Sequence, residues 1–307
     1  VRVMYDDMGC LPLLPENYQK YLESLNIKCV VFNKLKMFKG IFMNNRDHRK
    51  ITVIDGNIAY TGGLNLSDEY INKKIKYGYW KDNAIKLQGN SVWNLTIMFL
   101  SLWNSYKKED KDYLKFKTTD NLKIKPNGYL SAYASVPING VLEGEDVYLN
   151  IINKATKYVY IITPYLIIDT DMINSIILAF KRGVDVRIVI PGIPDKKIVY
   201  DLTMSYVKNL VDAGIKVYTY TPGFIHSKIF VSDDNKATVG TINLDYRSLY
   251  LHFENGVYLE DVKEIEDILN DVNNILTESH LLTKKETNYN IFRKVWQSIL
   301  RFFAPLF

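Results

Sequence analysis

The sequence predicts an α/β protein made of two pseudo-symmetric α-β-α lobes, each with a central mixed sheet. Two observations lead to this prediction. A set of five positions occurs twice with identical spacing, and short β-branched segments alternate with helical segments before each copy. Strands that alternate with helices form sheets covered by helices. We predict lobe boundaries at 1–117 and 118–307, with the charge-rich stretch 107–117 as the linker.

Composition indicates a folded protein with an anionic partner. Of the 307 residues, 47% are hydrophobic and 24% charged, which excludes a disordered chain. The net charge of +5 suits phospholipid or nucleic acid and does not choose between them. Cys10 and Cys29 are too few for a disulfide framework or a cysteine-rich metal site. The longest apolar run, 92–103, is shorter than the roughly 20 residues of a membrane span, so we expect a buried or interfacial helix. No signal peptide is recognised.

The two halves share an order of elements. Segment 1–7 is a predicted strand, 12–24 is compatible with a helix, and 27–32 is a second strand. The later half has a strand at 184–192, a helix around 199–213 and a strand at 215–220. Each of these passages leads into one copy of the repeated motif. The repeat therefore extends well beyond the motif and indicates a duplicated α/β unit.

Further elements precede the second copy. We predict strands at 128–134 and 158–163 and helices near 146–156 and 171–182. The first copy has no counterpart of these roughly 50 residues (128 to 183). We therefore expect the chain to be an N-terminally truncated part of a longer protein, with membrane spans possible in the missing part.

The repeated motif is the strongest signal in the sequence. Its spacing is His-x-Lys, then Asp, then Gly-small-x-Asn, and the offset between copies is constant (226 − 48 = 178 and 243 − 65 = 178). One His-x-Lys occurs by chance, but five matched positions that occur twice do not. The copies consist of His48, Lys50, Asp55, Gly62 and Asn65, and of His226, Lys228, Asp233, Gly240 and Asn243.

Local geometry follows from this spacing. Alternate residues of a strand point to one side, so each histidine shares a face with the lysine two positions later. Asp55 and Asp233 fall where the strands end in hairpin-like turns, which favours a structural role although they complete the catalytic motif. The following turns should bring Asn65 and Asn243 beside the histidines. Small residues at Gly63 and Thr241 would let backbone N–H groups approach an anion.

A carboxylate follows each motif on a neighbouring predicted strand. Asp82 precedes the strand-like segment DNAIKLQG, and Glu254 lies in the predicted strand 251–258. A carboxylate there could accept the second N–H of a histidine and set its tautomer. The alternative is a surface or ion-pair carboxylate.

The paired motif fits phosphodiester chemistry. One neutral imidazole attacks phosphorus to form a phosphohistidine, while the other protonates the leaving alkoxide and then deprotonates the acceptor. Lysines and asparagines can hold the non-bridging oxygens, so no metal or cofactor is required. A metal site at His48, Asp55, His226 and Asp233 is disfavoured by the adjacent lysines. The sequence also contains no Gly-x-Ser-x-Gly elbow and no Walker phosphate loop.

The C-terminal part contains a predicted helix at 262–277 and an amphipathic tail. The tail carries basic residues off an apolar face. Such a helix can lie in an anionic membrane surface or pack on its own domain, and both alternatives stay open. The predicted apolar face consists of Phe292, Val295, Trp296, Ile299, Leu300 and Phe303, and the basic residues are Arg293, Lys294 and Arg301.

The motif is that of the phospholipase D superfamily, and the wider chain resembles bacterial cardiolipin synthases. The resemblance covers nearly the whole chain and rests on segments 45–56, 61–70, 163–169, 181–192 and 226–248. Segment 134–137, Ala-Ser-Val-Pro, departs from the Ser-Gly-Pro stretch usual in the family. Family members carry N-terminal membrane helices before the first repeat.

The resemblance implies transfer of a phosphatidyl group from one phosphatidylglycerol to another, giving cardiolipin and glycerol. It implies His48 as nucleophile, His226 as general acid and base, and phosphate binding by Lys50, Lys228, Asn65 and Asn243. Asp82 and Glu254 match the positions that orient the histidines. Phosphatidylglycerol and an anionic membrane surface are the expected partners, at a bacterial cell membrane, with no nucleic acid expected. A hydrolytic phospholipase D, a nuclease of the superfamily and a degenerate binding module are the rival functions.

Overall fold

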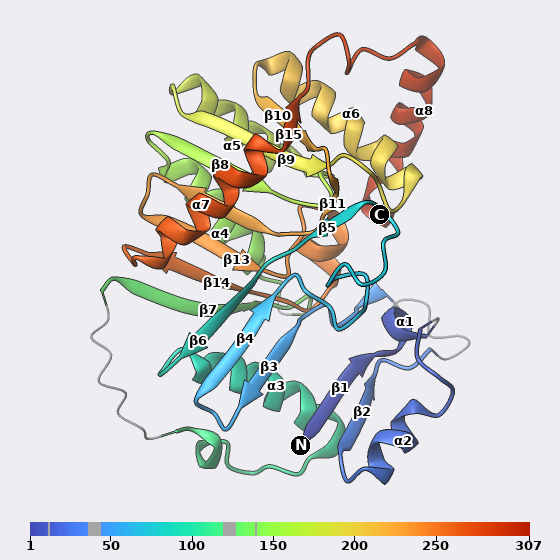
Figure 1. The fold of residues 1–307 in the computed structure, drawn as a ribbon, viewed down its shortest axis with the longest axis vertical. Coiled ribbons are helices and arrows are strands. Elements are labelled where there is room, and N and C mark those ends of the chain that lie inside the picture. Colours follow the sequence, from blue (N-terminus) through green and yellow to red (C-terminus); the bar gives the residue numbers. More distant parts are fainter. Residues whose placement is uncertain (12, 36–43, 119–126, 139) are drawn as a thin grey trace.

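The second lobe is built on one large mixed sheet. The structure is a computed structural model that describes residues 1–11, 13–35, 44–118, 127–138 and 140–307 (Figure 1). The eight strands lie in the order β15-β10-β9-β8-β12-β13-β14-β7, with β8, β9 and β10 parallel and the other neighbours antiparallel. They are β7 (Tyr129–Ser135), β8 (Tyr158–Ile162), β9 (Asp185–Pro191), β10 (Lys216–Tyr220), β12 (Ile229–Ser232), β13 (Lys236–Gly240), β14 (Glu254–Glu260) and β15 (Ser279–Leu281).

Helices cover both faces of this sheet, as Figure 1 shows. Strand residues alternate between two hydrophobic cores: Val159 and Ile161 pack into one, and Tyr160 and Ile162 into the other. The first core contains α4 (Glu143–Lys154), α5 (Thr170–Lys181) and α6 (Lys197–Ala213), and the second contains α7 (Glu264–Thr277) and the start of α3 (Val92–Lys107). The predicted α/β class with a mixed sheet is confirmed.

The first lobe repeats this pattern in separate sheets. β1 (Arg2–Asp6) pairs with β2 (Lys28–Phe32) in parallel, as β9 does with β10. β3 (Ile51–Ile54), β4 (Ile58–Gly62) and β6 (Ala84–Gln88) form an antiparallel sheet in the same order as β12, β13 and β14. In the second lobe β8 joins β9 to β12, whereas no strand among the described residues does so in the first. Two short helices, α1 (Asp7–Cys10) and α2 (Tyr18–Ser24), complete this lobe.

Helix α3 is a buried helix, as its apolar run predicts. Leu95 and Trp103 are fully buried, and α3 contacts both β3 of its own lobe and β7 of the other. Within the part of the chain that the structure describes, no helix has the length and apolar character needed to cross a bilayer.

The main chain also crosses between the lobes. β5 (Tyr79–Lys81) of the first lobe pairs in parallel with β11 (Gly223–Ile225) of the second. An isolated parallel bridge joins Asp47 of the first lobe to Phe253 of the second. Each crossing ends immediately before a His-x-Lys segment, so these two pairings place both motifs at the contact between the lobes.

Two expectations about local structure need correction. The stretch 107–117 is not simply a solvated linker, because Asp110 is buried and its carboxylate pairs with Arg2 and, at 2.7 Å, with Lys115. The predicted strand 251–258 begins later, at Glu254, because a π-helical turn (Arg247–Leu251) precedes it. The Asp245 carboxylate accepts a hydrogen bond from the Ser248 N–H at 2.7 Å and stabilises the turn.

Asp233, the aspartate of the second motif copy, has a structural role. Its carboxylate accepts hydrogen bonds from the N–H groups of Thr156, Lys157 and Tyr158 and from the Thr156 hydroxyl, at 2.7–3.0 Å. It thereby joins the β12–β13 turn to the start of β8. No hydrogen bond to the Asp55 carboxylate is found among the described residues, and no described strand occupies the β8 position in that lobe.

We predict that Asp233→Ala destabilises the protein by about 2 kcal/mol, since several hydrogen bonds to an ionised group are lost. Asp55→Ala is the matched control, because both aspartates have a positive φ, 54° and 50°. Partial burial raises the pKa of Asp233, but the donated hydrogen bonds outweigh it and hold that pKa below 3.8. The difference in the free energy of unfolding between the two variants should therefore be greatest above pH 4 and decrease in stronger acid. Equal urea midpoints at pH 7 would contradict this role.

Candidate active site

The two histidines occupy matching positions. Each follows directly after a residue that pairs with the opposite lobe and precedes a strand of its own lobe. The His226 N–H donates to the Lys81 carbonyl at 2.7 Å, and the His48 N–H donates to the Phe253 carbonyl at 2.9 Å. The next residue after Lys81 is Asp82, and the next after Phe253 is Glu254. The backbone contact therefore delivers a carboxylate from the opposite lobe to each histidine.

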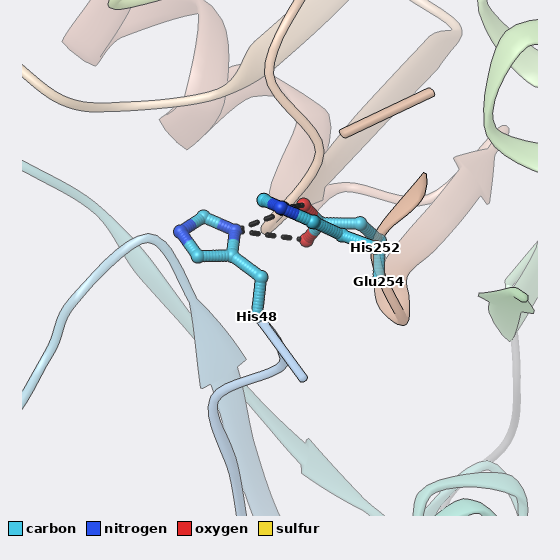
Figure 2. A group of neighbouring side chains, drawn as sticks. All are labelled: His48, His252 and Glu254. Carbon is cyan, nitrogen blue, oxygen red and sulfur yellow. Dashed lines mark hydrogen bonds and ion pairs between the residues drawn. The ribbon is translucent and has the colours of Figure 1, made fainter. Parts of the chain in front are cut away.

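His48 is held by Glu254. Its Nδ1 lies 2.9 and 3.0 Å from the two Glu254 carboxylate oxygens, and the Thr241 hydroxyl donates to the same carboxylate. Figure 2 shows the other ring nitrogen of His48, Nε2, pointing away from Glu254. A carboxylate at Nδ1 accepts its proton and leaves a lone pair on Nε2. The His48 side chain is 25% exposed, so Nε2 is accessible.

His226 is held by Asp82 in a more enclosed place. Its Nδ1 lies 2.7 Å from Asp82 Oδ2, and the Lys228 ammonium lies 3.1 Å from Nε2. The rings of Tyr70 and Trp80 surround it, with centroids 5.3 and 5.4 Å away. The His226 side chain is only 8% exposed.

The two carboxylates are therefore exchanged between the lobes. Each acid follows one motif in sequence but contacts the histidine of the other. Burial excludes the alternative of surface carboxylates, since the Glu254 and Asp82 side chains are 0% and 1% exposed. The position of each acid was predictable, but its crossed pairing was not.

Burial sets the protonation of the site. Desolvation lowers the pKa of His226 to about 4 and that of His48 to about 3, although the paired carboxylates oppose this shift. Burial also lowers the pKa of Lys228 to about 7. Burial raises the pKa of Glu254, but its interactions with His48 and His252 outweigh burial and keep that pKa low, so the carboxylate stays ionised. Both imidazoles are neutral at pH 7, as a nucleophile must be.

Lys50 and Lys228 come from different lobes but belong to one site. The Lys50 ammonium donates to the His48 carbonyl at 2.6 Å, and the Lys228 ammonium contacts the His226 ring and carbonyl. The charge of Lys50 contributes to lowering the pKa of both Lys228 and His226. The expected shared face of each His-x-Lys pair is confirmed by these contacts.

Of the two motif asparagines, Asn65 is linked to a histidine through Tyr70, and Asn243 is buried. Asn65 Nδ2 donates to the Tyr70 hydroxyl at 2.6 Å, and Tyr70 packs on His226. Asn243 is buried, with 6% exposure, and its Oδ1 has no hydrogen-bond partner among the described residues. Their side chains stay candidates for contact with a phosphodiester.

Gly63 and Thr241 do not present backbone donors to an anion, contrary to expectation. The Gly63 N–H donates to the Asn83 carbonyl at 3.0 Å, and the Thr241 N–H donates to the Asn255 carbonyl at 2.9 Å. Both groups are used in main-chain pairing. These two residues instead shape the places of the carboxylates, since Thr241 contacts Glu254 and Gly63 lies against Asp82.

We predict that Gly63→Ala lowers kcat by about 10–100-fold. A Cβ at Gly63 would lie 2.1 Å from Asp82 Oδ1, so Asp82 must move away from His226. Gly9→Ala is the control, because the nearest atom to its Cβ lies 3.8 Å away. Steady-state kinetics on a phosphodiester substrate measure the effect. A Gly63→Ala enzyme with unchanged kcat would show that the Asp82 position is not required.

Asp55 and Asp233 are not part of the site, although the motif includes them. Asp233 lies five residues beyond Lys228 along a strand, about 16 Å at 3.3 Å per residue. Its carboxylate is used by residues 156–158, as described above. The catalytic assignment of Asp233 is therefore corrected to a structural role at the β12–β13 turn, and Asp55 lies at the matching turn between β3 and β4.

Sequence reasoning missed His252. Its ring centroid lies 5.8 Å from that of His48, its Nδ1 lies 3.7 Å from Glu254 Oε1, and its Nε2 accepts from Arg247 Nε at 3.4 Å. Its place two residues before Glu254, on the same side of an extended chain, was the available signal.

His48, His252 and Glu254 also form the one cluster in the described chain with donors close enough to hold a metal, within 4.8 Å of one another. The contacts disfavour a dication there. His48 Nδ1 is occupied by Glu254, and Arg247 and Lys50 add positive charge around the cluster.

Comparison with known proteins agrees with this geometry. The family model "Cardiolipin synthase, PLD-like domain" matches residues 148–276. An uncharacterized protein of Streptococcus mutans is 45% identical over the whole chain, which spans 66% of that protein. Cardiolipin synthase 1 of Staphylococcus aureus strain COL is 36% identical over the whole chain, which spans 62% of it. The chain thus spans about two thirds or less of these relatives.

A solved structure shows the same fold. Phosphatidylserine synthase of Haemophilus influenzae superposes with a TM-score of 0.64 over 85% of this chain and 69% of its own, at 16% identity. These matches identify the PLD-like domain of cardiolipin synthase in residues 148–276 and show that the whole chain is similar to bacterial cardiolipin synthases.

Proposed function

We propose that the chain transfers a phosphatidyl group from one phosphatidylglycerol to a second, forming cardiolipin and releasing glycerol. The observation that carries this proposal is the pair of neutral imidazoles, each oriented by a buried carboxylate of the opposite lobe. Cardiolipin synthase relatives over the full length of the chain support the lipid substrate.

The reaction proceeds in two displacements. In the first, Nε2 of neutral His48 attacks phosphorus and the bond from phosphorus to the glycerol oxygen breaks. His226, which is protonated once the phosphodiester is bound, gives its Nε2 proton to the leaving alkoxide and becomes neutral. In the second, His226 takes the proton of a hydroxyl on another phosphatidylglycerol. That oxygen attacks phosphorus, and the bond to His48 breaks. The histidines end as they began.

Accessibility supports His48 as the nucleophile. Its Nε2 faces away from Glu254 and its side chain is 25% exposed, whereas Nε2 of the 8% exposed His226 is covered by Lys228. Asp82 holds the proton at Nδ1 of His226, so His226 gives and takes protons at Nε2.

The lysines and asparagines hold the phosphodiester. Lys50 and Lys228 supply positive charge from the two lobes, and Asn65 and Asn243 supply amide donors once the substrate displaces their present contacts. The anionic phosphodiester would also raise the pKa of His226 and so charge it for the first step.

Product analysis tests the proposal. The protein is incubated with phosphatidylglycerol vesicles, and the lipids are resolved by mass spectrometry, with His48→Ala as the blank. Cardiolipin and one glycerol per cardiolipin are expected. Phosphatidic acid without cardiolipin would identify a hydrolytic phospholipase D. Cleavage of nucleic acid without any lipid product would identify a nuclease.

A further inference from the structure

Helix α8 (Ile291–Phe302) exposes most of its apolar side chains, unlike an ordinary surface helix. Such a helix normally buries its apolar stripe. Here the buried positions are Gln297 and Leu300, and most of the apolar side chains face outward. Of the six residues predicted as the apolar face, only Leu300 is buried. The exposed side chains, which we call the outer face, are Ile291, Phe292, Val295, Trp296, Ile299, Phe302, Phe303 and Leu306, at 42–83% exposure.

Specific contacts hold α8 in this orientation. Arg293 forms a 2.6 Å ion pair with Asp201 of α6, and Gln297 Nε2 donates to the Asp201 carbonyl at 3.1 Å. Arg301 Nε donates to the Ser205 hydroxyl at 2.9 Å, and its guanidinium lies over the Tyr206 ring. The polar side of the helix is thus bound to α6, and the outer face stays uncovered within the described chain. Of the two alternatives that the sequence left open, packing of the apolar face on its own domain is therefore excluded within the described chain.

The tail leads from the outer face to the His48 side of the active site. After α8, the short 3₁₀ helix (Ala304–Leu306) ends with the Leu306 carbonyl 3.5 Å from Arg247 Nη1. Arg247 in turn contacts His252, whose ring lies 5.8 Å from that of His48. Figure 1 places the C-terminus near the junction of the lobes.

A second apolar segment lies on the His226 side. Leu66, Ile71 and Ile75 are 105%, 64% and 76% exposed. They belong to the loop 64–78 between β4 and β5, whose Asn65 and Tyr70 adjoin His226. Exposed lysines alternate with these apolar residues at Lys73, Lys74 and Lys76. Exposed apolar residues therefore lie in the loop that adjoins His226 and in the tail that leads toward His48.

The composition of these surfaces favours a lipid bilayer over a protein partner. Phenylalanine, tryptophan and isoleucine beside lysine are typical of helices that lie in a membrane interface. The lysines and the net charge of +5 complement anionic headgroups and oppose association of two copies. An apolar patch of this extent on a folded protein requires something to cover it.

We infer that the outer face of α8 and the loop 64–78 seat the chain on a bilayer of anionic phospholipid, with the active site between them facing the headgroups. The loop 64–78 adjoins His226, and the tail after α8 reaches Arg247, which contacts His252 beside His48, so both attachment points connect to the active site. This inference concerns how the site meets lipid and holds for a hydrolase as well as for the proposed synthase.

Vesicle co-sedimentation of the 307-residue chain tests the inference. Vesicles of phosphatidylglycerol and phosphatidylcholine are compared with phosphatidylcholine alone. We expect preference for the anionic vesicles and at least about a tenfold weaker partition for Phe292→Ser/Trp296→Ser/Phe302→Ser. A matched control, Tyr129→Ser/Ile138→Ser/Leu178→Ser, removes three side chains of similar exposure from other surfaces and should bind as the native chain does.

Two further measurements make the outcome decisive. The α8 triple variant should keep native turnover of a water-soluble phosphodiester such as bis(p-nitrophenyl) phosphate, and lose turnover of vesicle lipid. If the triple variant alters folding, Phe302→Ser alone, at an 81% exposed site, replaces it. Native vesicle binding by the variant would overturn the inference. So would a native dimer in sedimentation velocity that the variant converts to monomer. Vesicle binding without cardiolipin formation would keep the inference and reject the proposed function.

Discussion

Replacing His48 with alanine is expected to lower kcat by at least about 10⁴-fold and to abolish the covalent phosphoenzyme, because no other group can attack phosphorus. His226→Ala should lose lipid turnover to a similar extent for a different reason. In this variant His48 can still attack phosphorus, but no group protonates the leaving alkoxide or deprotonates the second alcohol.

A substrate with a nitrophenolate leaving group separates the two roles, since this group departs without a proton. With that substrate, His226→Ala should release one equivalent of nitrophenol in a burst and retain label from a phosphorus-labelled substrate. His48→Ala should show neither. Label that persists in His48→Ala and disappears in His226→Ala would reverse the assignment of the two histidines. Normal turnover in both variants would reject the mechanism altogether.

The exchange of carboxylates predicts a second large and crossed effect. Glu254→Gln, in the second lobe, should impair the nucleophile His48 of the first, and Asp82→Asn should impair His226. Each is expected to lower kcat by about 100-fold or more, because the amide no longer holds the proton at Nδ1. Glu254→Gln should reduce the nitrophenol burst, whereas Asp82→Asn should leave the burst and slow the step after it.

The pH dependence distinguishes the same two variants. Asp82 raises the pKa of His226 against the effect of burial, so its loss should lower that pKa further. The protonated acid then becomes scarcer, and the basic limb of kcat/KM should move to lower pH in Asp82→Asn. Glu254→Gln should not move this limb, because His48 acts in its neutral form. A rate profile displaced equally in both variants would contradict the crossed assignment.

Sequence patterns predicted the elements well where the signal is local. The strands that lead into His48 and His226, the helices of the second lobe and the burial of α3 all follow from periodicity within single segments. The crossed carboxylates do not follow from such patterns, since Asp82 and Glu254 each follow a motif in the same way. Their partners are set by the β5–β11 pairing, which joins residues 144 positions apart (223 − 79 = 144). Patterns within one segment of the sequence do not show which distant strand that segment pairs with.

The orientation of α8 could not be predicted for a related reason. Helical periodicity separates Val295 from Arg293 but does not say which side of the helix meets the protein. That choice depends on acceptors on α6, such as Asp201 and Ser205, which are distant in sequence. Gly63 was misassigned because a glycine beside a predicted anion site suggested a backbone donor, whereas its lack of a side chain makes room for Asp82.

The crossed carboxylates have a consequence for how the duplicated gene can change. A damaging substitution at Asp82 in the first copy disables His226 in the second. Selection therefore acts on both copies, and neither can accumulate such substitutions while the other maintains activity. A single unduplicated unit of this design would need a second polypeptide to supply the missing acid. Fusion of two such units into one chain makes that encounter permanent, and it ties the fate of both motifs together even where the sheets around them have diverged.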